Sequence, residues 1–227
     1  DDARNYIDTT NEEFSVIVTD VTNLKYKRNP YLYTREYFEI MRDALSEDGV
    51  AAAWLPVGGL SFEDLRTLIA TFDNVFPSTT AWYFTQFPTH FIILVGTPGP
   101  TLVNLDELKE MNEGVERDLL SLGVDNVYEL ASMLLLGESD IDMLVNDALI
   151  HTDNRPILEY SDMDLYNVVD VAPNLGQLLD FQREDLIEYF VGNENQLTEL
   201  ERSFDLFTGH YRDYVRLYEQ QQRDQTR

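Results

Sequence analysis

The clearest hydrophobic segment near the start of the chain is Phe14–Thr19, a short apolar run that is followed by the carboxylate Asp20. Its length and its content of Val and Ile predict a strand buried on both faces, as in a parallel sheet. Ligands of open α/β sheets bind outside the carboxyl ends of the strands. Asp20 is therefore the candidate chemical centre of the chain.

Two amphipathic helices are predicted after this strand. Thr34 is a candidate N-cap for a helix over residues 35–45, and Ser61 is a candidate N-cap for a second helix that begins at Phe62. Apolar side chains recur at helical spacing in both helices. They are Tyr37, Ile40, Met41, Ala44 and Leu45 in the first, and Phe62, Leu65, Leu68, Ile69 and Phe72 in the second. Gly49 is expected to adopt the left-handed conformation that ends the first helix.

The strands predicted between and after these helices complete an α/β pattern. Residues 50–55 form a second strand, and residues 79–85 and 91–95 form an antiparallel pair around the connector 86–90. Strands that alternate with helices over residues 14–96 indicate a doubly wound, mainly parallel sheet. The closing pair adds an antiparallel edge hairpin.

The second half of the chain shows mostly helical periodicity. A stretch rich in Gly and Pro, residues 96–101, marks a boundary. Residues 104–150 are predicted to be helical throughout, and residues 151–160 to be extended, because a helix interior does not tolerate Pro156. From Asn174 onwards the pattern is helical again, and its aromatic and Leu side chains recur every three or four residues, as in a packed helix pair.

These patterns divide the chain into three units. Residues 1–97 form a partial α/β domain, residues 98–172 a helical extension that contains the extended segment 151–160, and residues 173–227 a C-terminal helical hairpin or repeat-like tail. The α/β unit has no Gly-rich turn between a strand and a helix, which a doubly wound sheet usually carries after its first strand. We therefore expect the N-terminal, cofactor-binding half of the sheet to precede this sequence.

The acidic composition restricts the choice of partner. The chain has 42 acidic and 16 basic residues, and thus a formal net charge of −26. Nucleic acid is excluded, because phosphate binding needs Lys and Arg. Two interpretations remain: a cationic ligand attracted by a negative field, or adaptation to a salty cytoplasm, where salt screens the self-repulsion of an acidic surface. The even spread of the acidic residues and the scarcity of Lys favour the halophile interpretation.

The residue types also exclude several kinds of chemistry. Cysteine is absent, so disulfides and thiolate nucleophiles are excluded. His90, His151 and His210 are far apart in sequence and lack a metal-binding spacing, so we expect no metal site. No apolar segment reaches the ~18–20 residues of a transmembrane helix, and no signal peptide is recognisable. The chain as given is predicted to be soluble.

Several motifs resemble the spermidine synthase family, the polyamine aminopropyltransferases. They cover about residues 1–97 and are Asp1-Asp2-Ala3-Arg4, Val16–Asn23, Leu32–Phe38, Leu45–Val50 and Phe76-Pro77. The segment His151–Glu159 resembles one in bacterial and archaeal members that are fused to membrane-spanning regions. The resemblance implies the Rossmann-like fold of class I S-adenosylmethionine-dependent methyltransferases. The chain would then carry the C-terminal half of that sheet, followed by an α-helical region.

The resemblance also implies a co-substrate, decarboxylated S-adenosylmethionine or S-adenosylmethionine itself. Asp2, with Ala3 beside it, matches the carboxylate that binds the adenine amino group, and Asp20 matches the catalytic carboxylate at the cofactor. Such a role for Asp20 is chemically reasonable, because an ammonium ion must lose a proton to an acceptor before it can attack a carbon. A carboxylate also attracts the cation. The competing interpretation of Asp20 is a strand-end residue that caps a turn.

Four residues are candidates for substrate binding: Thr22, Asn23, Tyr33 and His90. Asn23 occupies the position where the family usually has a second carboxylate, and the family's substrate-binding loop is shortened before His90. Tyr33 is alternatively a packing residue and His90 alternatively a hairpin residue. We interpret His151, Asp153 and Arg155 as a structural clamp built on Arg–carboxylate pairing.

Two functions from different classes follow. The first is an aminopropyltransferase that acts on a small amine such as putrescine, in the cytoplasm or at the cytoplasmic face of the membrane. The second is a noncatalytic or methyltransferase-like descendant that serves as a scaffold and binds a partner. The resemblance further implies a homodimer and a membrane tether through segments that precede the sequence.

Overall fold

The computed structural model describes residues 2–20, 24, 29–83, 90–163, 171–183 and 185–225. In chain order its helices and strands are α1 (Ala3–Thr9), β1 (Phe14–Thr19), α2 (Arg35–Asp43), β2 (Leu45–Pro56), α3 (Phe62–Asp73), β3 (Ser78–Tyr83), β4 (Phe91–Thr97), β5 (Val103–Asn104), α4 (Leu105–Ser121), α5 (Val127–Ala131), β6 (Leu134–Leu136), α6 (Glu138–Val145), α7 (Val171–Phe181), β7 (Phe190–Val191) and α8 (Glu194–Gln225). Short 3-10 helices cover Asn29–Tyr33, Ile157–Tyr160 and Leu186–Tyr189.

The main sheet has five strands in the order β1-β2-β4-β3-β6. The β1–β2 pair is parallel and the other pairs are antiparallel, so β1, β2 and β3 share one direction while β4 and β6 oppose it. The predicted Rossmann-like α/β class and the antiparallel hairpin are confirmed. The hairpin does not form the edge of the sheet, however, because β4 lies between β2 and β3, and β6 pairs with β3 beyond it.

Strand β6 corrects the prediction that residues 104–150 are helical throughout. Leu134, Leu135 and Leu136 are all almost fully buried, and they form the edge strand beside β3. A run of three apolar residues fits a buried strand and a buried helix equally well, so periodicity alone does not separate the two.

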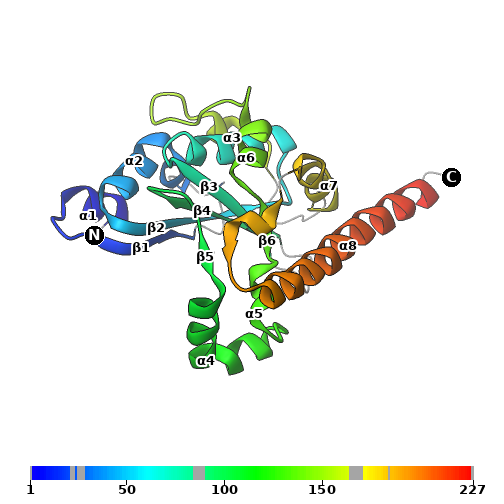
Figure 1. Ribbon diagram of the computed structural model, residues 1–227. Helices are drawn as coiled ribbons and strands as arrows, with labels where there is room; N and C mark the ends of the chain where they lie inside the picture. The colour runs from blue at the N-terminus through cyan, green and yellow to red at the C-terminus, as the bar shows by residue number, and fades with distance from the viewer. Residues whose placement is uncertain are drawn as a thin grey trace.

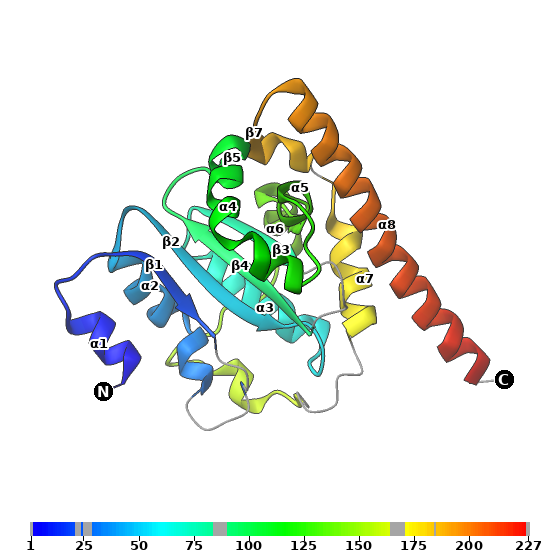
Figure 2. The same cartoon turned by 90° about the horizontal axis from the view of Figure 1, so that it is seen from below.

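Helices cover the two faces of the sheet unequally. Helices α2, α3 and α6 lie on one face, and α4 and α5 lie on the other (Figure 1). The covered face buries alternate residues of the strands, among them Ile17, Ala53 and Leu94, against the apolar side chains of α2 and α3. Seen from below, α4 and α5 lie in front of the β3–β4 side, and no helix crosses β1 or β2 (Figure 2).

The lower face of β1 is therefore open. Val16 is 60% exposed and Val18 is 53% exposed, whereas Ile17 between them is 7% exposed. The strand was expected to be buried on both faces, and the structure shows burial on one face only. We refer to the surface of β1 and β2 on this side as the open face.

The predicted ends of the helices can be compared directly with the structure. The N-caps are confirmed: the hydroxyl of Thr34 accepts from the backbone N–H of Tyr37 at 3.3 Å, and that of Ser61 from the N–H of Asp64 at 3.1 Å. The left-handed role of Gly49 is wrong, because Gly49 lies within β2 and its φ is not positive. Glycine is needed there for another reason: a Cβ atom would lie 2.9 Å from the carbonyl oxygen of Phe14.

The C-terminal half packs onto the same core. Leu158 and Leu175 belong to the same buried cluster as the side chains of α2 and α3, and the hydroxyl of Tyr211 on α8 donates to the carbonyl oxygen of Tyr83 on β3 at 3.1 Å. Phe207 and Tyr211 are buried, as the packing interpretation of the aromatic run predicts. The division into three units remains a prediction, although the middle unit contains strands as well as helices.

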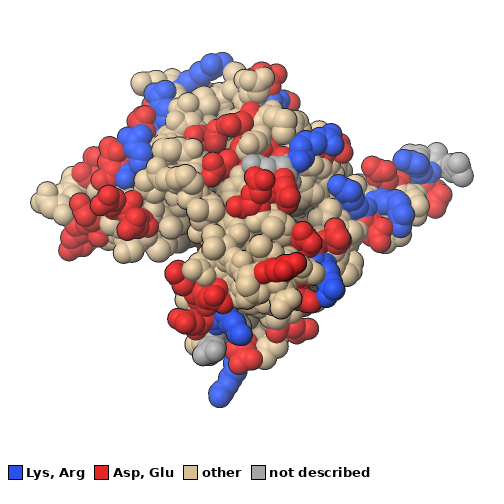
Figure 3. Space-filling model, viewed as in Figure 1, with Lys and Arg blue, Asp and Glu red and all other residues tan. Residues whose placement is uncertain are grey.

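Acidic side chains are scattered over the visible surface rather than gathered in one patch (Figure 3). This distribution agrees with a dispersed acidic surface, and the halophile interpretation stays a prediction. Among the described residues, no helix combines the length and the apolar character that crossing a membrane requires.

Candidate functional site

Asp20 directly follows β1 and is exposed at the carboxyl end of that strand, where the sequence placed it. In the parallel β1–β2 pair, Val18 lies opposite Ala52 and Thr19 lies opposite Ala53. Successive side chains of a strand point to opposite faces of the sheet. If this pattern continues for one residue beyond Thr19, Asp20 lies beside Trp54 on the open face. The expected position of the candidate carboxylate at a strand end is thus observed.

Asp2 and Ala3 lie at the start of α1, and both are exposed. The Oδ1 atom of Asp2 accepts a hydrogen bond from the backbone N–H of Arg4 at 3.0 Å, so Asp2 is the N-cap of the helix. This capping bond fixes the direction of the carboxylate. The adenine contact remains a prediction, and the cap is the role that the geometry shows.

Tyr37 of α2 links Asp2 to the end of β1, and sequence reasoning missed it. Burial raises the pKa of its hydroxyl, a hydrogen bond with the side chain of Thr19 and the charge of Arg4 lower it, and the nearby Asp2 carboxylate raises it further. The charge of Asp2 and the side chain of Thr19 therefore both act on the same buried hydroxyl, although 17 positions separate them in sequence. The only available signal was a hydroxyl group within an otherwise apolar helix stripe.

Tyr33 and His90 behave as their structural interpretations predict. Tyr33 is fully buried, and its hydroxyl donates to the carbonyl oxygen of Trp54 on β2 at 2.6 Å. His90 is exposed at the start of the hairpin strand, where its carbonyl oxygen accepts from the N–H of Val57 at 2.7 Å. The predicted residues Thr22 and Asn23 lie outside the described residues.

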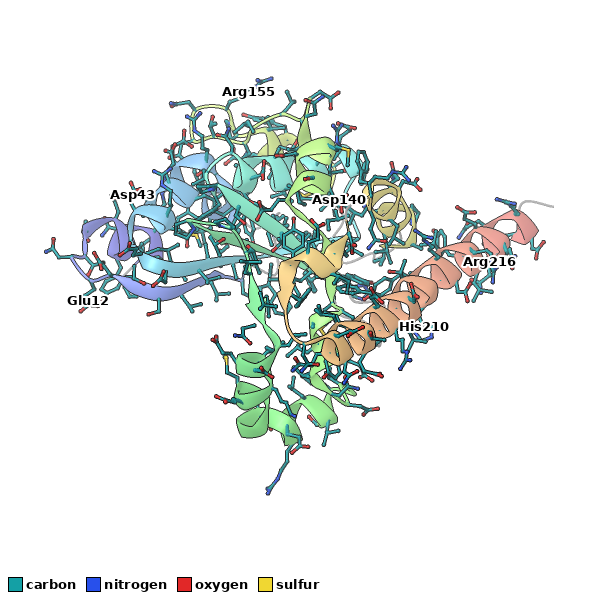
Figure 4. The ribbon with its side chains drawn as sticks, viewed as in Figure 1. Glu12, Asp43, Asp140, Arg155, His210 and Arg216 are labelled. Carbon is teal, nitrogen blue, oxygen red and sulfur yellow. The ribbon has the colours of Figure 1, made fainter. Side chains whose placement is uncertain are left out.

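The turn of residues 151–155 holds the start of α1 in place. Asp153 forms a bidentate ion pair with Arg4, at 3.0 Å from Nη1 to Oδ1 and 2.5 Å from Nη2 to Oδ2. The predicted clamp is confirmed for Asp153, but its basic partner is Arg4 rather than Arg155, which lies at the outer surface (Figure 4). His151 is fully buried beneath the turn.

The described residues contain no group of three or more His, Cys, Asp or Glu side chains that could hold a metal ion. The candidate residues are one exposed carboxylate at the end of β1, a second carboxylate that caps α1, and aromatic side chains on β2 and β4. Such a constellation can bind a cation and accept a proton. The fold is thus an open α/β sheet with a carboxylate at a strand end, which is where proteins of this class bind their ligands.

Comparison with known proteins makes this class more specific. Residues 1–96 match the family model of the spermine/spermidine synthase domain. A polyamine aminopropyltransferase of Saccharolobus solfataricus (strain ATCC 35092 / DSM 1617 / JCM 11322 / P2) is 28% identical over 122 residues, which are 52% of this chain and 40% of the relative. The segment 1–96 of this chain is thus similar to the spermine/spermidine synthase domain.

Solved structures described as spermidine synthases also resemble the chain. A probable spermidine synthase from Corynebacterium glutamicum ATCC 13032 is 20% identical, with a TM-score of 0.47, over 67% of this chain and 52% of that chain. A spermidine synthase in complex with the transition-state analogue AdoDATO is 26% identical, with a TM-score of 0.36, over 42% of this chain and 34% of that one. The chain spans about two fifths of the length of the curated relative.

Proposed function

We propose that the protein containing this chain is an aminopropyltransferase of the spermidine synthase type. It transfers the aminopropyl group of decarboxylated S-adenosylmethionine to a small amine such as putrescine. The observation that carries the proposal is the exposed Asp20 at the carboxyl end of β1, within the segment that matches the family model. The curated relative is a polyamine aminopropyltransferase by description.

Asp20 is the proton acceptor in this proposal. The amine nitrogen attacks the aminopropyl carbon bonded to the sulfonium, the carbon–sulfur bond breaks, and its electron pair stays on sulfur. The leaving group is a neutral thioether, so it needs no proton. The proton of the attacking ammonium passes to the Asp20 carboxylate, which also attracts the cation before the reaction.

Asp2 and Ala3 are proposed to contact the adenine end of the co-substrate. The support is that Asp2 is exposed and that its carboxylate is directed by the capping bond from the N–H of Arg4. A carboxylate accepts hydrogen bonds only, so it suits the donor hydrogens of an amino group. Thr22 and Asn23 stay in the proposal as substrate-binding residues, and Tyr33 as a residue that supports the backbone at Trp54.

The test uses the full-length protein. Calorimetry measures the binding of decarboxylated S-adenosylmethionine, and product formation is then measured with putrescine for wild type, Asp20→Asn and Asp43→Asn. Asp43 is an exposed carboxylate at the end of α2 and serves as the matched control. We expect binding in all three proteins and a loss of rate of about 10²-fold or more in Asp20→Asn alone. No binding by wild type contradicts the enzyme, and equal rates contradict the role of Asp20.

A second candidate function is a noncatalytic scaffold that binds a partner. The observation that favours it is Asn23 at the position of the family's second carboxylate. Product formation by wild type would exclude this alternative. The cytoplasmic location, a homodimer and a membrane tether are further proposals that follow from the family, and each needs the full-length protein.

A further inference from the structure

Two aromatic side chains lie at the same end of the sheet as Asp20. The Trp54 and Phe91 rings have centroids 6.1 Å apart and planes inclined by 58°. Trp54 follows Ala53, which pairs with Thr19 at the end of β1, and Phe91 begins β4, where it pairs with Pro56. Residues two apart on a strand share a face, so Trp54, Pro56 and Phe91 all belong to the open face.

Both residues are only partly buried. The apolar hollow between the sheet and helices α4 and α5 is lined by Trp82, Ile93 and Val95, on the β3–β4 side, and does not include Trp54 or Phe91. The backbone at Trp54 is nevertheless fixed, because the buried hydroxyl of Tyr33 donates to its carbonyl oxygen. The indole is therefore a half-exposed ring on a well-held strand.

We propose that Trp54 and Phe91 form an aromatic wall that binds the alkylammonium chain of the acceptor amine beside Asp20. The inference rests on the proposed function and names specificity-determining residues for it. An aromatic face attracts a cation and also packs against methylene groups. Asp20 supplies the opposite charge at the same end of the sheet. Together they select a ligand that carries an ammonium group on an apolar stem and reject a neutral molecule of the same length.

The kinetic test uses two substitutions of Trp54 in the full-length protein. Trp54→Phe keeps an aromatic face and is expected to keep the KM for putrescine within about threefold. Trp54→Leu keeps an apolar side chain without the face, and is expected to raise that KM by about tenfold while kcat changes by less than threefold. Thermal melting of both variants verifies the fold. An unchanged KM in a folded Trp54→Leu variant overturns the aromatic wall.

A second measurement does not depend on turnover. The chain has two tryptophans, Trp54 and Trp82, and the difference between the fluorescence titrations of wild type and Trp54→Phe isolates the signal of Trp54. We expect putrescine to change that signal and 1,4-butanediol, its uncharged counterpart, to leave it unchanged. If wild type forms no product, the proposed transferase activity is contradicted. The titration still tests whether the aromatic wall binds the amine. Equal fluorescence changes with putrescine and 1,4-butanediol, or no change with either molecule, overturn the aromatic wall.

Discussion

Arg4 and Asp153 form a two-point ion pair across 149 positions of the sequence. Arg4 also donates from Nη1 to the carbonyl oxygen of Tyr31 at 3.1 Å, and the N–H of Asp153 donates to Glu36 at 2.9 Å. The start of α1, which carries Asp2, is thereby tied to a turn outside the family-matching segment 1–96. The C-terminal half thus helps to hold the candidate cofactor end of the site.

Removing this ion pair is expected to destabilise the chain. In a double-mutant cycle of Arg4→Ala and Asp153→Ala, we expect a coupling energy of about 1 kcal/mol or more, because the pair is bidentate and mostly shielded from water. Partial burial opposes the ionisation of Asp153, but the Arg4 guanidinium outweighs it and holds the carboxyl pKa below its usual range. The contribution is therefore present at neutral pH and is lost as the pH falls below about 4. Urea unfolding measures each variant.

The matched control is the exposed pair Arg202–Glu199 on α8, whose side chains are 69% and 52% exposed. A cycle on that pair is expected to give less than about 0.5 kcal/mol, because solvent screens it. Equal coupling energies in the two cycles would contradict the special role of the Arg4–Asp153 pair.

His151 is expected to make the chain less stable in weak acid. Its Nδ1 accepts from the N–H of Leu158 at 3.4 Å, so the proton of the neutral ring is on Nε2, which donates to the carbonyl oxygen of Pro30 at 3.1 Å. Burial lowers the pKa of the ring. Below about pH 6.5 the unfolded chain binds a proton that the folded chain resists, so stability falls by at most about 1.4 kcal/mol per pH unit.

The measurement compares wild type with His151→Gln by urea unfolding at pH 5.5 and pH 7.5. The variant loses packing and hydrogen bonds at both values, but it lacks the titrating ring. The stability advantage of wild type is therefore expected to shrink at pH 5.5. An advantage that stays constant would mean that the ring does not titrate in this range.

The sequence predicted those features that depend on neighbouring residues. The caps at Thr34 and Ser61 are local hydrogen bonds, and the exposed position of Asp20 follows from the end of one apolar run. Features set by distant contacts were missed. Gly49 is explained by the carbonyl oxygen of Phe14, and Tyr37 on α2 forms a hydrogen bond with Thr19 at the end of β1. Neither contact leaves a periodic signal in the chain.

Asp73 is expected to have the opposite effect on pH dependence. Burial raises the pKa of its carboxyl group to about 6, and the nearby Asp142 carboxylate on α6 adds to the shift. Between pH 4 and pH 6 the folded chain binds a proton that the unfolded chain has lost, so stability falls as the pH rises through this range. Allowing for the solvent contact of this side chain, the total loss is about 1–2 kcal/mol.

Replacing this carboxyl group tests the shift directly. Asp73→Asn is expected to be more stable than wild type by about 1 kcal/mol at pH 7.5 and equally stable at pH 4. Asp48→Asn removes one negative charge from an exposed position of β2 and controls for the net charge of the chain. If both variants gain the same stability at pH 7.5, general charge repulsion rather than burial is the cause.

Gly96 is expected to tolerate no side chain. It lies in β4 opposite Ala51, and a Cβ atom there would lie 2.5 Å from Cγ of Phe76 and 2.8 Å from Cε1 of Phe72. These two rings pack on each other at 4.5 Å between centroids, so neither can move away without disturbing the core. Gly96→Ala should therefore cost about 2 kcal/mol of unfolding free energy.

The control is Gly99→Ala, because an added Cβ at Gly99 has no heavy atom within 4 Å, and the expected change in unfolding free energy is within about 0.5 kcal/mol. Thermal or urea unfolding compares the two, and equal stabilities would show that the α3–β4 contact relaxes freely around an added methyl group.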